Sequence, residues 1–160
     1  MWGAGASPAV ARRSVHAPAA DEASFAELCA AVDRGEVAAA ELVLETMYPG
    51  FALGSGAELA WALARRLPLA VDIAHLAIQR AAGVLDAATL ARVLDCDHIA
   101  EIHVSQSDNA RDRHLPLAPD TFGLAWARER ERAGATIVLE CYMHRLPLAE
   151  RQRQIELLRS

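Results

Sequence analysis

Four short runs of β-favouring residues each deliver a metal-binding side chain at or near their carboxyl end. These side chains are Glu45, Asp72, His103 and Glu140. Carboxylates and imidazoles, in a set without thiolates, are the ligands that Mn, Mg, Co, Fe or Zn take in catalytic sites. Such an ion polarises a carbonyl or hydroxyl group, or turns a water molecule into a nucleophile near neutral pH. One acidic residue at a strand end is usually only solvated, but four such ends in succession predict a divalent-metal site.

Three further polar residues lie close to this set in the sequence. His75 follows Asp72 by three positions, and Asp112 and His114 lie in the polar segment after the third run. Asp112 and His114 alternate, so an extended backbone points both side chains the same way and lets them bind one ion together. A polar loop that ends at Pro116 is the plainer interpretation of the same residues. We expect contacts to a second metal ion or to the substrate from His75, Asp112 and His114.

The elements that must position these side chains alternate between strands and helices. The strand-like runs are Leu42–Thr46, Leu69–Ile73, Ile99–Val104 and Thr136–Glu140. Segments with helical spacing of apolar residues are Ser24–Asp33, Ala57–Arg66, Ala87–Leu94, Phe122–Arg132 and Leu148–Leu158. This alternation is typical of βαβ units with right-handed crossovers and a parallel sheet. Because the carboxyl ends of parallel strands meet at one edge, the four metal-binding side chains are expected to converge there.

Residue types at the segment boundaries support these helices. Asp21, Asp86 and Asp120 stand where an N-cap side chain is needed. Gly35 and Gly134 fall just past helix ends, where a left-handed backbone is often required. The strands begin roughly 30 residues apart, as in βαβ units. The chain therefore forms either a small open α/β sheet or half of a (β/α)8 barrel, and periodicity alone does not choose between them.

Composition and charge exclude several classes of protein. The 160 residues carry 16 Lys and Arg against 21 Asp and Glu, a formal net charge of -5, which disfavours a dedicated nucleic-acid binder. Three cysteines without CxxC spacing predict neither a disulfide framework nor a zinc ribbon, so a reduced, cytoplasmic chain is expected. No apolar run approaches the roughly 20 residues of a membrane span, so no membrane partner is expected.

The first 20 residues are rich in Ala, Gly, Ser and Pro and have no continuous apolar stretch of the kind found in secretory signals. We therefore expect a flexible N-terminal tail over residues 1–20. The remaining residues, 21–160, are enough for one hydrophobic core and too few for two comfortable domains. A single domain over 21–160 is expected.

The chain resembles the C-terminal half of the xylose isomerase-like TIM-barrel superfamily. The residues that carry the resemblance are, in order, Glu45, Asp72-x-x-His75, His103, Asp112-x-His114 and Glu140. That superfamily includes sugar phosphate isomerases and epimerases and the family 2 AP endonucleases. Two segments, Glu101–Ser105 and Asp112–Leu117, look most like the seventh strand and loop of the isomerase and epimerase members. The resemblance covers about residues 41–160 and implies a partial (half) TIM barrel with four parallel βα units.

The resemblance implies a role for these residues that depends on the branch. In ketose 3-epimerases one divalent ion is held by residues at the positions of Glu45, Asp72, His103 and Glu140. The two glutamates there also act as acid and base on opposite faces of the sugar carbon. In the endonuclease branch a multinuclear zinc cluster also uses the positions of His75, Asp112 and His114. Multi-iron barrels that modify peptide natural products use a related set.

The leading prediction is a divalent-metal-dependent isomerase or epimerase that acts on a small sugar or polyol-carbonyl compound. Glu45 and Glu140 would exchange a proton through an enediolate, and His75 and Arg113 would bind and orient the substrate. The alternatives are a truncated or partner-dependent half-barrel without activity of its own, and a multinuclear enzyme. The multinuclear enzyme would be a phosphodiesterase or of the multi-iron peptide-modifying type.

Half a barrel exposes two strand edges and an open inner face, and both are costly. A homodimer, or a separate N-terminal half-barrel chain, is therefore the expected partner besides the small-molecule substrate.

Four other polar residues receive no catalytic role. Cys141 follows Glu140, and strand alternation turns its side chain away from the site. His98 is interpreted as a loop or helix-end residue, and His16 as part of the tail. Glu101 shares the inward face with His103, and the sequence alone offers no firm account of it.

Overall fold

The computed structural model describes residues 13–159 and contains one parallel sheet, in the order β1–β2–β3–β4–β5. The strands are β1 (Arg13–His16), β2 (Leu42–Glu45), β3 (Leu69–Asp72), β4 (Ile99–Val104) and β5 (Thr136–Leu139). The helices are α1 (Glu22–Asp33), α2 (Glu36–Ala39), α3 (Gly56–Ala64), α4 (Ile73–Ala81), α5 (Ala87–Asp95), α6 (Leu124–Arg132) and α7 (Leu148–Arg159), with a 3-10 turn η1 (Met143–Arg145). All neighbouring strands are parallel, which confirms the α/β class.

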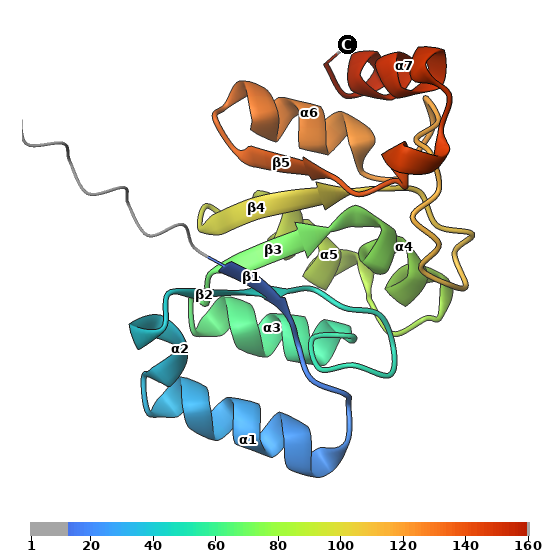
Figure 1. The fold of residues 1–160 in the computed structure, drawn as a ribbon. Coiled ribbons are helices and arrows are strands. Elements are labelled where there is room, and N and C mark those ends of the chain that lie inside the picture. Colours follow the sequence, from blue (N-terminus) through green and yellow to red (C-terminus); the bar gives the residue numbers. More distant parts are fainter. Residues whose placement is uncertain (1–12, 160) are drawn as a thin grey trace, which may run out of the picture.

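The helices flank a sheet that remains open. Figure 1 shows α6 and α7 beyond β5 at one end of the sheet, and α1 and α2 at the other end. Helix α6 packs on β4 and β5, α4 packs on β4, and α3 packs on α5. Within residues 13–159, β1 and β5 form the two edges of the sheet. In this part of the chain no helix is long and apolar enough to cross a membrane.

The central strand β3 is buried throughout its length. Leu69, Ala70, Val71 and Asp72 are each 0% exposed. A continuous apolar run is what a parallel strand covered on both faces requires. The carboxylate of Asp72, at the end of this run, is therefore carried into the interior by its strand.

The N-terminal segment does not behave as the expected tail. Residues 13–16 form β1, which pairs in parallel with β2 so that His16 lies opposite Glu45. The chain beyond β1 is also tied down, because Ala20 N donates to Gly50 O at 2.9 Å and Ala52 N donates to Pro18 O at 2.7 Å. The boundary predicted at residue 21 and the count of four strands are therefore corrected to a domain that includes residues 13–20 and has five strands. The rest of the predicted tail, residues 1–12, lies outside the described residues.

Helix α4 was not expected from the sequence. It begins at Ile73, directly after β3, and the Asp72 side chain serves as its N-cap by accepting from His75 N at 3.0 Å. The apolar run had predicted a strand that included Ile73, because strand and helix join here without a loop. The same residue thus ends β3, caps α4 and contributes a carboxylate to the candidate site.

Two of the three predicted N-caps are confirmed. Asp21 accepts from Ser24 N and Asp86 accepts from Thr89 N, both at 2.8 Å. Asp120 is wrong as a cap, because α6 begins after Gly123, whose φ is 73°. A Cβ on Gly123 would lie 2.9 Å from Cγ2 of Ile73, so close packing of α6 against α4 excludes a side chain there.

Two buried glutamines fasten loops that carry site residues. Gln79 of α4 donates from Nε2 to Met47 O at 2.6 Å and to Leu53 O at 3.1 Å, which holds the segment after β2. Gln154 of α7 accepts from Leu117 N at 2.6 Å and donates to Leu117 O at 3.2 Å, which holds the segment after β4. Both side chains are 0% exposed, so the donors and acceptors in these bonds are paired within the protein instead of with water.

Candidate metal centre

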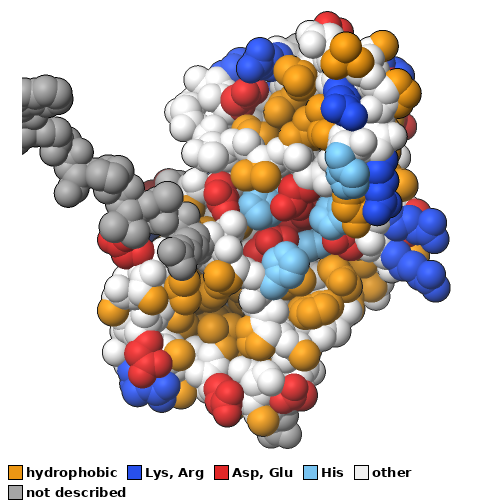
Figure 2. Space-filling view, in the orientation of Figure 1, with side chains coloured by type: hydrophobic (Ala, Val, Ile, Leu, Met, Phe, Trp, Pro, Cys, Tyr) orange, Lys and Arg blue, Asp and Glu red, His pale blue; other side chains and the backbone are white. Residues whose placement is uncertain are grey.

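Four side chains from four neighbouring strands meet at the carboxyl edge of the sheet. One ligand atom from each lies within 4.8 Å of the others, and the four residues are Glu45, Asp72, His103 and Glu140. The parallel register explains this arrangement, because Asp72 pairs with His103 across β3 and β4. Glu140, the residue after β5, donates its backbone N–H to Val104 O at 3.0 Å. Figure 2 shows acidic and histidine side chains gathered at the centre of this face, between two apolar areas.

The cluster is buried and held together by charge. Glu45, Asp72 and His103 are 3%, 0% and 4% exposed. Nδ1 of His103 lies 3.5 Å from Oε2 of Glu45 and 3.1 Å from Oε1 of Glu140. Burial lowers the pKa of His103, but the nearby carboxylates of Glu140 and Glu45 outweigh burial and raise that pKa to about 11. Burial raises the pKa of Asp72 to about 7. The protein thus gathers more negative charge at this edge than one imidazolium balances.

Glu101 has a clear place that the sequence did not reveal. Its Oε1 lies 3.2 Å from Nε2 of His103, the ring nitrogen that points away from Glu45 and Glu140. A carboxylate at this position keeps a proton on Nε2 and leaves Nδ1 as the nitrogen that faces the cluster. Glu101 is therefore a positioning residue for His103.

The second predicted set lies directly beside the first. Nε2 of His75 and Nε2 of His114 lie 3.3 Å and 3.1 Å from Oδ2 of Asp112. Nδ1 of His75 contacts the carbonyl of Thr46 at 2.8 Å, so Nδ1 carries a proton and donates to that oxygen, while Nε2 faces the carboxylate of Asp112. Burial lowers the pKa of His75, but the carboxylates of Asp112 and Asp72 outweigh burial and raise that pKa to about 9. Nδ1 of His114 lies 3.8 Å from Oε2 of Glu140, which links the two sets.

His16 is a site residue that the sequence analysis assigned to the tail. Its Nε2 lies 3.3 Å from Oε2 of Glu45, and its side chain is 71% exposed. The position follows from strand pairing, because His16 lies opposite Glu45 in the β1–β2 register. The only local signal for this strand is a short Ser14–Val15 step before the histidine, which is too brief to predict a strand.

Arg113 does not reach the four-residue cluster. Its Nε forms an ion pair with Oδ2 of Asp108 at 2.7 Å, and the side chain is 53% exposed. It lines a pocket of about 440 Å3 together with His114, Tyr142 and Arg145. The guanidinium of Arg145 stacks 4.2 Å from the centre of the Tyr142 ring. The pocket adjoins the site through His114, so Arg113 remains a candidate substrate contact.

The residues present fit a divalent cation. Four buried polar atoms at this edge have no hydrogen-bond partner among the described residues: Asp72 Oδ2, His75 Nε2, His103 Nδ1 and His114 Nδ1. Leaving a buried polar atom unpaired costs about 1–3 kcal/mol. A cation bound by these oxygens and nitrogens would satisfy the unpaired atoms and offset the clustered carboxylates. Imidazole and carboxylate donors without sulfur suit Mn, Mg, Co, Fe or Zn. Cys141 is buried and contacts Gln154 at 3.9 Å, away from the cluster as expected.

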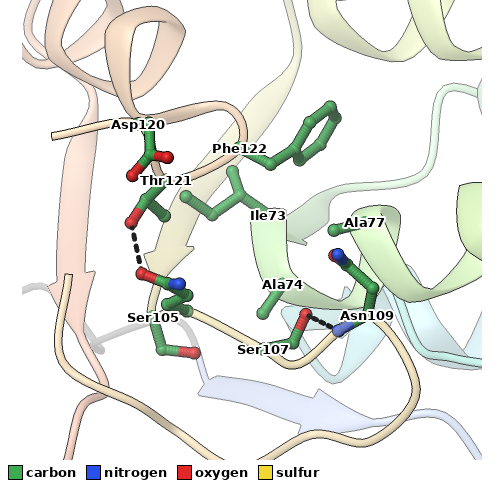
Figure 3. Close-up of a pocket in the computed structure, with 10 residues that line it drawn as sticks. Ile73, Ala74, Ala77, Ser105, Ser107, Asn109, Asp120, Thr121 and Phe122 are labelled. Atoms are coloured by element: carbon green, nitrogen blue, oxygen red, sulfur yellow. Dashed lines mark hydrogen bonds between the residues drawn. The ribbon is translucent and has the colours of Figure 1, made fainter. Parts of the chain in front are cut away.

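A second cavity offers a weaker case for ligand binding. Figure 3 shows this space, of about 200 Å3, between the start of α4 and the segment that follows β4. Its polar groups are largely bonded to one another, because Thr121 donates to Gln106 at 3.0 Å and Asn109 N donates to Ser107 at 3.2 Å. The hydroxyl of Ser105 is buried there without a partner among the described residues. One ordered water would satisfy a single hydroxyl, so we assign this cavity no ligand.

Comparison with models of known protein families, with curated proteins and with solved structures finds no match to this chain.

Proposed function

We propose that this chain is a divalent-metal-dependent isomerase or epimerase of a small sugar or polyol-carbonyl compound, built on part of a xylose isomerase-like barrel. The observation that carries the proposal is the convergence of Glu45, Asp72, His103 and Glu140 within 4.8 Å at the carboxyl edge of a parallel sheet. That edge is where barrel and open-sheet enzymes hold their sites. The order of these residues along the chain, and the resemblance they carry, favour proton transfer over other metal chemistry.

The two glutamates are the groups that move the proton. Glu45 enters from β2 and Glu140 from the end of β5, and both lie within 3.5 Å of His103 Nδ1. A substrate carbon held between them would lose its proton to one carboxylate, and the other would return a proton to the opposite face. A bound divalent cation would supply Lewis-acid polarisation of adjacent substrate oxygens and so acidify that C–H bond. Asp72, the buried member, would hold the cation.

Substitution of Glu140 tests this proposal. Glu140→Gln keeps the shape of the side chain and removes its basicity, so exchange of substrate C–H for solvent deuterium should fall by about 10²- to 10⁴-fold. The measurement is proton NMR of a panel of ketoses and sugar phosphates incubated with the metal-loaded protein in D2O. Glu129→Gln, at an exposed position on α6, is the matched control and should exchange like the wild type. Exchange at the wild-type rate in Glu140→Gln would exclude the assignment.

A multinuclear metal enzyme is the second candidate. The contacts of the Asp112 carboxylate with the imidazole rings of His75 and His114 favour it. His75, Asp112 and His114 form a continuous chain of contacts beside the first cluster. His16 adds a further imidazole on the side of Glu45. Elemental analysis of the purified protein and of a variant with both Glu45→Gln and His103→Asn separates the candidates, because the difference between the two counts the ions at this edge. One ion at this edge supports the isomerase, and two or three ions support a phosphodiesterase or a multi-iron peptide-modifying enzyme.

We also propose that the working form is completed by a second chain, either another copy or an N-terminal half-barrel polypeptide. In the described part of the chain β1 and β5 are edge strands, which supports this proposal because unpaired parallel strands leave backbone donors and acceptors without partners. Size-exclusion chromatography with light scattering tests it. A metal-loaded dimer supports closure by a second copy. A metal-free monomer without exchange activity favours the alternative of a partner-dependent half-barrel with no activity of its own.

A further inference from the structure

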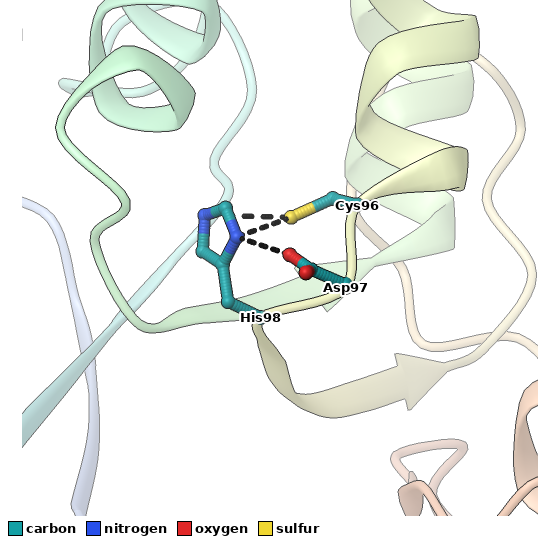
Figure 4. Close-up of side chains that lie close together, drawn as sticks. All are labelled: Cys96, Asp97 and His98. Carbon is teal, nitrogen blue, oxygen red and sulfur yellow. Dashed lines mark hydrogen bonds and ion pairs between the residues drawn. The ribbon is translucent and has the colours of Figure 1, made fainter.

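A second cluster of potential ligands lies at the opposite, amino edge of the sheet. Cys96, Asp97 and His98 are consecutive and connect α5 to β4. Figure 4 shows the three side chains folded toward one another across this turn. A thiol sulfur, a carboxylate oxygen and an imidazole nitrogen lie within 4.8 Å of one another. Ile99 and His103 are four residues apart on β4, about 13 Å at the rise of a parallel strand, so this cluster is separate from the carboxyl-edge site.

The contacts within the cluster compete for one nitrogen. Nδ1 of His98 lies 3.2 Å from Sγ of Cys96 and 3.1 Å from Oδ1 of Asp97. A ring nitrogen carries at most one hydrogen, so it cannot donate fully to both neighbours. Within residues 13–159, the only hydrogen-bond contacts of the His98 ring are with Cys96 and Asp97. A cation would be bound by sulfur, oxygen and nitrogen together once the ring turns the lone pair of one nitrogen toward it.

The backbone beneath the cluster is held by another helix. Cys96 is 8% exposed and follows the last residue of α5. Arg130 of α6 donates to the carbonyl of Cys96, and the indole of Trp126 donates to Leu94 O at 2.9 Å. The thiol is therefore presented from a fixed backbone. The side chain of His98, by contrast, is 19% exposed and lines a pocket of about 370 Å3.

We propose that Cys96, Asp97 and His98 bind a borderline-soft divalent cation such as Zn2+. The thiolate distinguishes this site from the sulfur-free cluster at the carboxyl edge and selects zinc over magnesium or manganese. Sγ lies 3.4 Å from Nε2 as well as 3.2 Å from Nδ1, so the sulfur sits over the ring face. Binding therefore requires the imidazole to rotate until its lone pair meets the cation. Asp95, which lines the same pocket, or a water molecule supplies the fourth ligand.

Cobalt substitution tests this site without reference to enzymatic activity. A sulfur ligand gives Co2+ an intense thiolate-to-metal charge-transfer band in the near ultraviolet, and the carboxyl-edge cluster contains no sulfur. The full chain titrated with Co2+ should develop this band and lose it when Zn2+ is added. Cys96→Ser should lose the band, and Cys29→Ser, the matched control, should keep it. A variant with both Glu45→Gln and His103→Asn should also keep it, so failure of the proposed function and failure of this site are distinguishable.

A second variant tests the site even if Cys96→Ser does not fold. His98→Asn, which alters a partly exposed side chain, keeps the thiol and should weaken Co2+ binding by more than the roughly tenfold that loss of an outer contact causes. Circular dichroism checks that the variant is folded. The proposal is overturned if wild-type protein with excess Co2+ shows no thiolate band, if the band survives in Cys96→Ser, or if folded His98→Asn binds Co2+ like the wild type.

Discussion

Replacing Glu101 should weaken metal binding at the carboxyl edge although Glu101 is not a ligand. In the structure its carboxylate lies 3.2 Å from Nε2 of His103, whose side chain is only 5% exposed. Without this acceptor the imidazole loses the contact that keeps a proton on Nε2 and holds Nδ1 toward the cation position beside Glu45 and Glu140. Loss of such an outer partner typically costs about 10- to 100-fold in metal affinity, or about 1.4–2.7 kcal/mol.

Titration calorimetry with Mn2+ on Glu101→Ala measures this loss directly. Glu101→Gln retains an oxygen acceptor without the charge and should fall between Glu101→Ala and the wild type. Glu129→Ala, at an exposed position on α6, is the control for a lost surface carboxylate. The Glu101 side chain is 19% exposed, so water reaches part of the gap and the loss should lie toward the lower end of that range. A folded Glu101→Ala variant with an unchanged dissociation constant would refute the positioning role.

Three further predictions concern protons, loop support and ligand-linked stability. Metal affinity should rise with pH by about tenfold per unit for each proton released. His103, whose pKa is raised to about 11, must lose a proton when the cation binds, and below pH 7 Asp72, whose pKa is raised to about 7, must lose a second proton. Calorimetry in buffers of different ionisation enthalpy counts the released protons. A metal affinity that does not change with pH contradicts the geometry. Gln79→Met should lower the free energy of unfolding by about 2 kcal/mol or more, because the buried carbonyls of Met47 and Leu53 lose their donor. Urea denaturation measures this loss, and Gln152→Met, at an exposed position on α7, is the control. A divalent cation at 100 times its dissociation constant should raise the free energy of unfolding by about 2.7 kcal/mol, and His103→Asn should lose most of this stabilisation. Equal stabilisation of the wild type and of His103→Asn would place the ion elsewhere.

The candidate site was largely visible in the order of residues along the chain. In a parallel sheet every strand ends at the same edge, so Glu45, Asp72, His103 and Glu140 could be grouped before any coordinates were known. The same logic identified the segment with Asp112 and His114. The roles of these residues as metal ligands stay predictions.

Other features depend on contacts that no local pattern encodes. Residues 13–16 are too few and too polar to predict a strand, and they become one because β2 offers an edge whose register places His16 opposite Glu45. Helix α4 was hidden because β3 runs into it at Asp72 without a loop.

The α/β class, the strands β2 to β5 and the chemistry at their ends could be predicted from the residues alone, because they follow from local periodicity and from the common direction of parallel strands. Three-dimensional packing was needed to show which nitrogen of His103 faces the carboxylates and that Glu101 holds it so. It was also needed to show that Cys96, Asp97 and His98 fold toward one another at the far edge. These depend on side-chain rotation and on packing between distant segments, and neither has a sequence period.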